Sequence, residues 1–151
     1  MKKGWTFLEL LTVIGITGVA ASVLLPLHTK RIRLGRTQMM TQQIKKIYSC
    51  IVRENKSSQT NPIMPVLVND GLISSVNNMF SYPYSLSYNN HIVTITTDVP
   101  KDEVSSDFPP EIQVTEVPNN RSVWQLTYSN NLPFGNRQTE MFNWFFVGQR
   151  S

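Results

Sequence analysis

The sequence contains one carboxylate close to the start of a long apolar stretch. A charged group is unfavourable in such surroundings, so its presence there must be explained. From Trp5 to Leu27 the chain carries one charged residue, Glu9. No Lys or Arg lies within a helical turn after Glu9, and Lys3 is six positions before it, too far to be its neighbour on a helix face. An acid in apolar surroundings needs a partner. We therefore expect the partner of Glu9 to belong to another chain.

The apolar stretch is long enough to cross a membrane. Its 23 residues would form about 34 Å of helix, and the hydrocarbon core of a bilayer is about 30 Å thick. A cleaved secretory signal, a permanent single-pass anchor and a segment cut at its cytoplasmic edge all fit this composition, although ordinary signals have only about 7–15 apolar residues. Charge counting leaves the orientation open, because two lysines precede the stretch and four cations follow it. The cations that follow are Lys30, Arg31, Arg33 and Arg36.

The segment KKGWTFLELLTVIGITGVAASVLLP, residues 2–26, resembles the class III signal of type IV pilins and type II secretion pseudopilins. That signal is a short basic leader ending in Gly, then an aromatic residue, a Thr and a Glu at the fifth mature position. Here Gly4 ends the leader, and Trp5 replaces the more usual Phe. Thr6 follows, and Glu9 is fifth from the cut. The resemblance covers about the first fifth of the chain.

The resemblance implies a processing step and a mode of assembly. A membrane prepilin peptidase would cut after Gly4, and the new amino group of Trp5 would be N-methylated. Glu9 of a neighbouring subunit would pair with that positive end. Two charges that are each costly alone in an apolar bundle are tolerated as a pair, and such buried polar groups can set register between helices.

The resemblance also implies roles for the rest of the segment. Gly18 and Pro26 stand where pilin helices often carry Gly and Pro, and the stretch between them would extend or unwind within a filament. We assign Thr6, Gly18 and Pro26 to the assembly segment together with Glu9. The family places the anchor in the bacterial inner membrane and the head in the periplasm. Its partners would be other pilins or pseudopilins, the prepilin peptidase, the inner-membrane assembly platform and membrane lipid.

Helix signals continue beyond Pro26. Four apolar residues recur at i, i+4, i+7 and i+11, which is one stripe of a helix: Met40, Ile44, Ile47 and Ile51. The opposite face is predicted to carry Arg36, Gln42, Gln43, Lys46 and Arg53. The polar run at residues 54–62 ends the pattern. The sequence therefore predicts one helix from residue 5 to about residue 54, whose stripe packs against a head.

The remainder of the chain alternates as β-strands do. Residues 63–73 form a short apolar element with a turn at Asn69–Gly71, and two β-rich runs meet at Asn89-Asn90 as a hairpin. Further strands are predicted at residues 111–117, 122–129 and 141–147. We expect an α+β, pilin-like fold in which the long N-terminal helix lies across an antiparallel sheet. Its parts would be a leader (1–4), a transmembrane helix (5–27), an amphipathic continuation (28–54) and a β-rich head (55–151).

Composition limits the possible functions. The formal charge is +4, but ten of the 14 Lys and Arg lie in residues 1–56 and the remainder is acidic, which favours lipid headgroups or a partner helix over nucleic acid. Cys50 is the only cysteine, so an intrachain disulfide is excluded. An acidic loop is predicted to be solvated, with no calcium-ligand pattern: Asp102, Glu103, Asp107 and Glu111. No nucleophile motif, phosphate loop or dinucleotide loop is present, so we expect no enzyme, metal or cofactor.

These observations favour a structural subunit, and specifically a minor pilin, because major pilins commonly carry a C-terminal disulfide loop that one cysteine cannot make. A minor pseudopilin of a type II secretion system and a competence-pilus subunit are close alternatives. A different class also stays open: a membrane-anchored periplasmic binding module that never polymerises. Such a module would need neither Gly4 nor Glu9.

Overall fold

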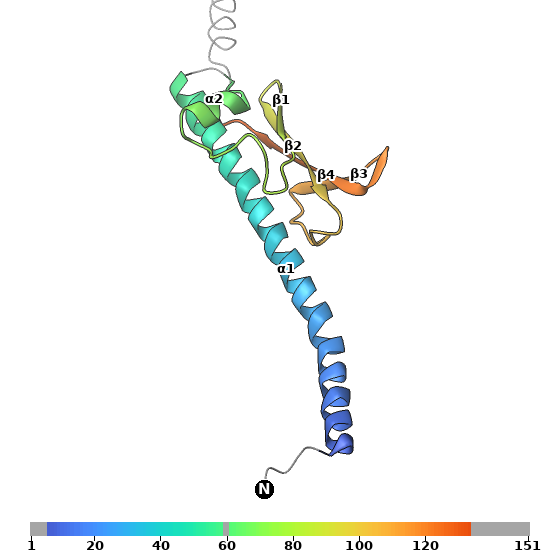
Figure 1. The fold of residues 1–151 in the computed structure, drawn as a ribbon. Coiled ribbons are helices and arrows are strands. Elements are labelled where there is room, and N and C mark those ends of the chain that lie inside the picture. Colours follow the sequence, from blue (N-terminus) through green and yellow to red (C-terminus); the bar gives the residue numbers. More distant parts are fainter. Residues whose placement is uncertain (1–5, 59–60, 134–151) are drawn as a thin grey trace, which may run out of the picture.

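A computed structural model of the chain describes residues 6–58 and 61–133. A long helix comes first and a sheet follows (Figure 1). The elements are α1 (Phe7–Ser58), α2 (Met64–Asn69), β1 (Tyr84–Asn89), β2 (Ile92–Pro100), β3 (Ile112–Val117) and β4 (Asn120–Asn131). The predicted α+β class with a long N-terminal helix is confirmed. The predicted leader, 1–4, and the predicted last strand, 141–147, lie outside the described residues.

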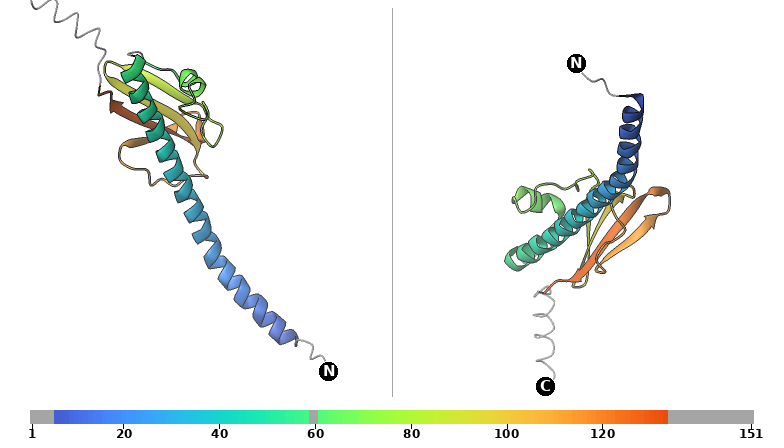
Figure 2. Two further views of the ribbon diagram at one scale, coloured as in Figure 1. Left: turned by 90° about the vertical axis from the view of Figure 1, so that its left-hand side faces the viewer. Right: turned by 90° about the horizontal axis from the view of Figure 1, so that it is seen from below.

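Helix α1 is continuous over 52 residues, with Pro26 inside it. It ends at Ser58, four residues beyond the predicted end, within the polar run that was expected to stop it. Figure 2 shows that only the C-terminal half lies against the head, whereas the N-terminal half extends away from it. Along α1, residues 7–34 are exposed, and the first buried residue is Thr37.

The described strands form one antiparallel sheet in the order β1-β2-β4-β3. β1 and β2 are joined by the predicted hairpin, in which Asn90 has a φ of 55°, a left-handed conformation that Asn tolerates better than most residues. β4 is the longest strand and pairs with both β2 and β3. The sheet therefore depends on β4, which joins the hairpin to the edge strand β3.

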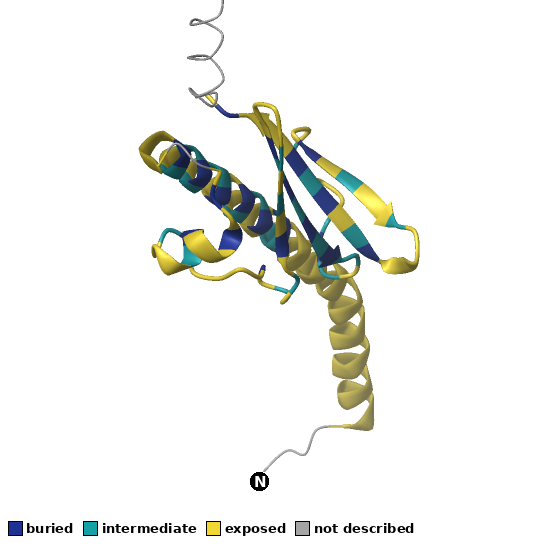
Figure 3. Cartoon of the chain, turned by 90° about the horizontal axis from the view of Figure 1, so that it is seen from above, coloured by how far each residue is buried: buried dark blue, intermediate teal, exposed yellow. Residues whose placement is uncertain are grey.

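The core lies between the C-terminal half of α1 and one face of the sheet (Figure 3). Met40, Ile44 and Ile51 are fully buried, and Ile47 is nearly so, which confirms the predicted stripe. Thr37 and Asn55 extend the same stripe as buried polar residues. The sheet presents alternate residues of its strands to this stripe, among them Val93, Ile95, Leu126 and Tyr128. The apolar residues that alternate along β2 and those that recur every three to four residues along α1 thus pack together in one core.

Helix α2 and the turn after it close one end of the core. Met64, Leu67 and Ile73 are buried there. The predicted turn is present, and Gly71 has a φ of +68°, which glycine adopts without steric cost. Across this end, the hydroxyl of Tyr88 on β1 donates to the carbonyl of Pro62 at 2.5 Å.

Two residues expected on the face of α1 away from the head contact the head instead. Arg36 forms an ion pair with Glu103, and Oε1 of Gln43 accepts a hydrogen bond from the hydroxyl of Tyr84 at 3.0 Å. The prediction was wrong for these two because each adjoins a stripe residue, so a long side chain reaches round the flank of the helix. The other three polar residues predicted for that face, Gln42, Lys46 and Arg53, are exposed.

Candidate functional site

The start of α1 is a capping box built from Thr6 and Glu9. The backbone N–H of Thr6 donates to Oε2 of Glu9 at 2.8 Å, and the Thr6 hydroxyl donates to the same oxygen at 3.0 Å. In return, the backbone N–H of Glu9 donates to the Thr6 hydroxyl oxygen at 3.3 Å. A Ser or Thr followed three residues later by Glu satisfies free backbone donors at a helix start in this reciprocal way. Thr6 is therefore the N-cap of α1.

This local partner of Glu9 was not anticipated from the sequence. A cation was the expected partner, and within residues 6–58 and 61–133 no cation pairs with Glu9. The signal that would have found the partner is the spacing T-x-x-E at the start of an apolar run. The capping box involves one carboxylate oxygen, Oε2. Gly4 and Trp5 lie outside the described residues, so their predicted roles stay predictions.

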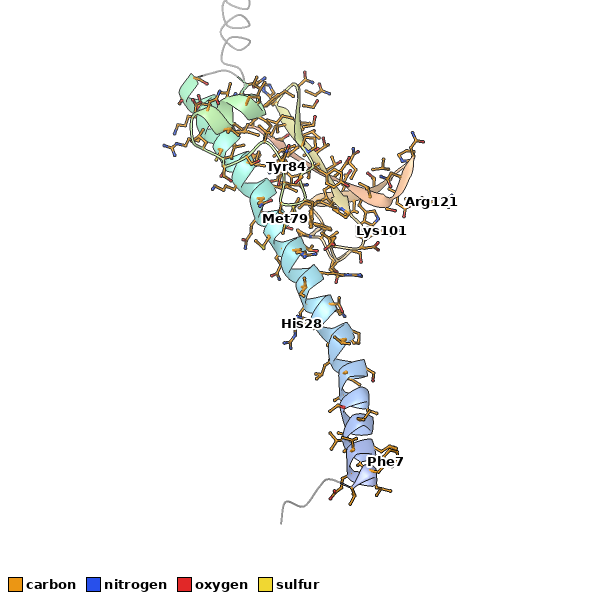
Figure 4. All side chains as sticks on the ribbon, in the orientation of Figure 1. Phe7, His28, Met79, Tyr84, Lys101 and Arg121 are labelled. Carbon is orange, nitrogen blue, oxygen red and sulfur yellow. The ribbon has the colours of Figure 1, made fainter. Side chains whose placement is uncertain are left out.

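The N-terminal half of α1 is apolar and uncovered. Within the described residues, α1 is the one helix long and apolar enough to cross a membrane, and its most apolar window is not buried by the rest of the chain. The large side chains there are exposed, including Phe7 at 79% and Leu25 at 68%; Figure 4 shows Phe7 at the far end of the helix from the head. Such a surface requires lipid or other helices to cover it.

Hydroxyl side chains in this half of α1 are satisfied within the helix. The hydroxyls of Thr12, Thr17 and Thr29 each donate to a backbone carbonyl four residues earlier, at 2.6–2.9 Å. In an apolar phase this pairing removes the cost of an unmet donor. Polar residues in the span are therefore compatible with a membrane environment.

Gly18 and Pro26 lie within regular helix, so the described state of α1 contains no extended segment between them. A Cβ added at Gly18 would meet no atom within 4 Å. Packing inside the chain therefore does not require a glycine there. Any requirement for small size at Gly18 must come from a neighbour outside this chain.

The acidic loop between β2 and β3 is largely exposed, and two of its carboxylates pair with cations of α1. Glu103 pairs with Arg36, and Glu111 pairs with Lys45 at 2.5 Å. The hydrogen bond between Glu111 and Lys45 lowers the pKa of Glu111 and raises that of Lys45. The described residues contain no group of three or more His, Cys, Asp or Glu side chains able to hold a metal ion. Asp102, Asp107 and Glu111 are exposed, as predicted for a solvated loop, and the sequence did not predict the two surface ion pairs with α1.

Buried polar contacts reinforce this attachment. The hydroxyl oxygen of Thr37 accepts a hydrogen bond from the backbone N–H of Ser105 at 2.9 Å, and the hydroxyl donates to the Arg33 carbonyl at 3.0 Å. At the other end of the head, the Tyr48 hydroxyl donates to the Asn131 carbonyl at 2.6 Å. The half-buried Cys50 directs its Sγ towards the Leu72 carbonyl at 3.5 Å. The head is thus joined to α1 along the length of the stripe.

Comparison of the chain with protein-family models, with curated proteins and with solved structures finds no match. The fold alone therefore defines the class. A long N-terminal apolar helix packed on an antiparallel sheet is a pilin-like architecture, with one helix suited to anchoring the chain in a membrane.

Proposed function

We propose that the protein is a pilin-like structural subunit, and not an enzyme, of a type IV pilus-type filament. In this proposal a prepilin peptidase cuts after Gly4 and Trp5 is N-methylated. The subunit waits in the bacterial inner membrane with its head in the periplasm, and then assembles through its N-terminal helix. A minor pilin is the favoured assignment, and a minor pseudopilin of a type II secretion system is the alternative. The assembly platform, membrane lipid and other pilins are the partners; nucleic acid is not.

The observation that carries the proposal is the exposed Glu9 in the first turn of an uncovered apolar helix. Its Oε2 is engaged by Thr6, but a carboxylate has about four acceptor sites on its two oxygens. An ammonium from a neighbouring chain can therefore bind without breaking the capping box. The apolar surface around Glu9 is what a bundle of such helices would bury, and in that surrounding a cation is the partner that a carboxylate needs.

The capping box also supports a second candidate, the membrane-anchored binding module that does not polymerise. Thr6 gives Glu9 a complete local role, because a capping box stabilises a helix start by itself. In that candidate Glu9 has no partner in another chain, and no cut after Gly4 is needed. The filament subunit requires the negative charge of Glu9, whereas the binding module requires only its hydrogen bonds in the capping box.

Two substitutions at one position separate these roles. Glu9→Gln removes the charge and preserves the capping box, because Gln serves at this position of the box as Glu does. Glu9→Ala removes both. The proposal expects each variant to be cut after Gly4 and to be depleted from sheared filaments about tenfold or more, as loss of a charge-assisted hydrogen bond of about 1.5–3 kcal/mol predicts. The measurement is quantitative immunoblotting of filament and membrane fractions.

The mass of the N-terminus is the matching control. A cellular chain that begins at a methylated Trp5 supports processing, whereas an intact Met1 or a cut near Ser22 contradicts it. Should Glu9→Gln enter filaments as the unaltered chain does while Glu9→Ala does not, the charge is unnecessary. The binding-module candidate would be favoured if the chain were never cut and both variants kept their full function.

A further inference from the structure

The buried stripe of α1 continues below the head, and its character changes there from apolar to cationic. Counting back from Thr37 by helical steps of three and four gives Arg33, Lys30 and Pro26, which lie on the same face. This face borders a cleft of about 540 Å³ between α1 and the loop that follows β2. The cleft is lined by Pro26, Thr29, Lys30, Arg33, Lys101, Asp102, Val104, Ser105, Ser106 and Trp124.

The charges of the cleft leave a net positive potential. Lys30 and Arg33 have no carboxylate within ion-pair distance in residues 6–58 and 61–133. Lys101 is already engaged, because its Nζ is 2.9 Å from Oε1 of Glu116 and 5.5 Å from the centre of the Trp124 ring. Asp102 offsets one of the two unpaired cations. One positive charge therefore remains uncompensated, which suits a ligand with a single negative charge.

The position of the cleft indicates where such a ligand would come from. Leu25 and Leu27, within two turns before Lys30, are exposed apolar residues towards the end of the uncovered half of α1. In Figure 4, Lys101 lies on the head and His28 lies further along α1 in the direction of Phe7. If the apolar half of α1 is in a bilayer, Lys30 and Arg33 stand at the depth of the phosphates, where cations and Trp side chains are favoured.

We propose that this cleft binds the phosphodiester of an anionic phospholipid headgroup, held by Arg33 and Lys30. Arg33 is suited to two parallel hydrogen bonds with phosphate oxygens, and Lys30 adds a second cation one turn away. The cleft volume is within the usual range for small-ligand sites. The proposal rests on the proposed function only in that α1 must span a bilayer. It needs neither cleavage after Gly4 nor a filament.

The test uses the full, unpolymerised chain in nanodiscs of phosphatidylcholine with a minor fraction of phosphatidylglycerol. Native mass spectrometry then counts the phosphatidylglycerol molecules that stay bound after gentle release. Arg33→Gln and Lys30→Gln remove cleft cations, and Arg31→Gln is the matched control. Arg31 has the same charge and the same depth on α1, but it does not line the cleft. General attraction to an anionic surface would fall equally in all three variants.

The expected result is one retained phosphatidylglycerol per chain, with retention in Arg33→Gln about tenfold or more below that in Arg31→Gln, as loss of a charge-assisted hydrogen bond predicts. Equal losses in Arg33→Gln and Arg31→Gln would overturn the proposal in favour of unspecific surface attraction. Unchanged retention of phosphatidylglycerol by Arg33→Gln would also overturn the proposal. If that variant were in addition depleted from filaments, the cleft would serve an acidic segment of another subunit. Inorganic phosphate retained in discs of phosphatidylcholine alone would assign the site to free phosphate. If the chain were not cut after Gly4, the proposed function would fail, but the binding of phosphatidylglycerol to the cleft would be unaffected.

Discussion

The hydroxyl of Thr37 is predicted to hold the loop between β2 and β3 against α1. Thr37 is 1% exposed, and its hydroxyl oxygen is the acceptor for the backbone N–H of Ser105 at 2.9 Å. Thr37→Val keeps the side-chain shape and removes that acceptor. A buried donor left unmatched costs about 1–3 kcal/mol. Because Ser105 is only half-buried, we expect a loss of about 1–2 kcal/mol in the free energy of unfolding of the head.

Thr41→Val is the matched control. Thr41 lies one turn further along α1, and its hydroxyl donates only to the Thr37 carbonyl, at 2.9 Å, within the same helix. Val and Thr have similar helix propensities, so this control should change the free energy of unfolding by less than about 0.5 kcal/mol. Urea unfolding in detergent, followed by the fluorescence of Trp124, measures both variants. Trp5 and Trp144 are replaced by Phe so that the signal comes from β4.

The comparison of the two valine variants decides the matter. If Thr37→Val is as stable as Thr41→Val, the contact between Thr37 and Ser105 does not hold the loop, and the attachment must depend on the ion pairs of Glu103 and Glu111. If both variants lose more than about 1 kcal/mol, the loss reflects removal of a threonine hydroxyl from α1 in general and not the contact with Ser105. Only a selective loss in Thr37→Val agrees with the structure.

Two further predictions concern the core and its polar closure. Ile44→Ala, at a fully buried position, should cost about 2–5 kcal/mol of unfolding free energy, whereas Met39→Ala, at a position 52% exposed, should stay within about 0.5 kcal/mol by the same urea assay. Burial raises the pKa of Tyr88 to about 12. Its hydroxyl therefore stabilises the fold fully below its unfolded pKa of about 10, and this stabilisation is lost as the pH rises towards 12. Tyr88→Phe should lack that loss in alkaline unfolding curves.

Much of the fold could be predicted because it follows from two periodicities. The stripe from Met40 to Ile51 recurs with the helical period, and β2 alternates from Val93 to Val99 with the strand period. Each pattern names the face that must be buried, so the packing of α1 on the sheet follows directly. The pairing order of the strands does not follow, because alternation shows which face of β4 is buried but not that β4 lies between β2 and β3.

The polar contacts between α1 and the head could not be predicted from the same patterns. Arg36 and Gln43 stand at the flanks of the stripe and are half-buried, so the apolar pattern alone does not decide whether they face solvent or the head. Their partners, Glu103 and Tyr84, are more than 40 positions away in the chain. No local rule relates residues at that separation. A strongly cationic helix followed by an acidic loop is a signal of possible pairing, but it does not give the register.

Glu9 can cap its own helix and, in the proposed filament, also pair with the amino group of a neighbouring subunit. The T-x-x-E spacing places its Oε2 on Thr6 and so fixes the rotamer of the carboxylate. A fixed carboxylate loses less side-chain entropy when it later binds a cation. The capping box would therefore favour pairing with a neighbour's amine instead of competing with it. On this argument Thr6→Ala should weaken assembly through Glu9, and Thr6→Ser, which keeps the hydroxyl, should restore it in the same filament assay.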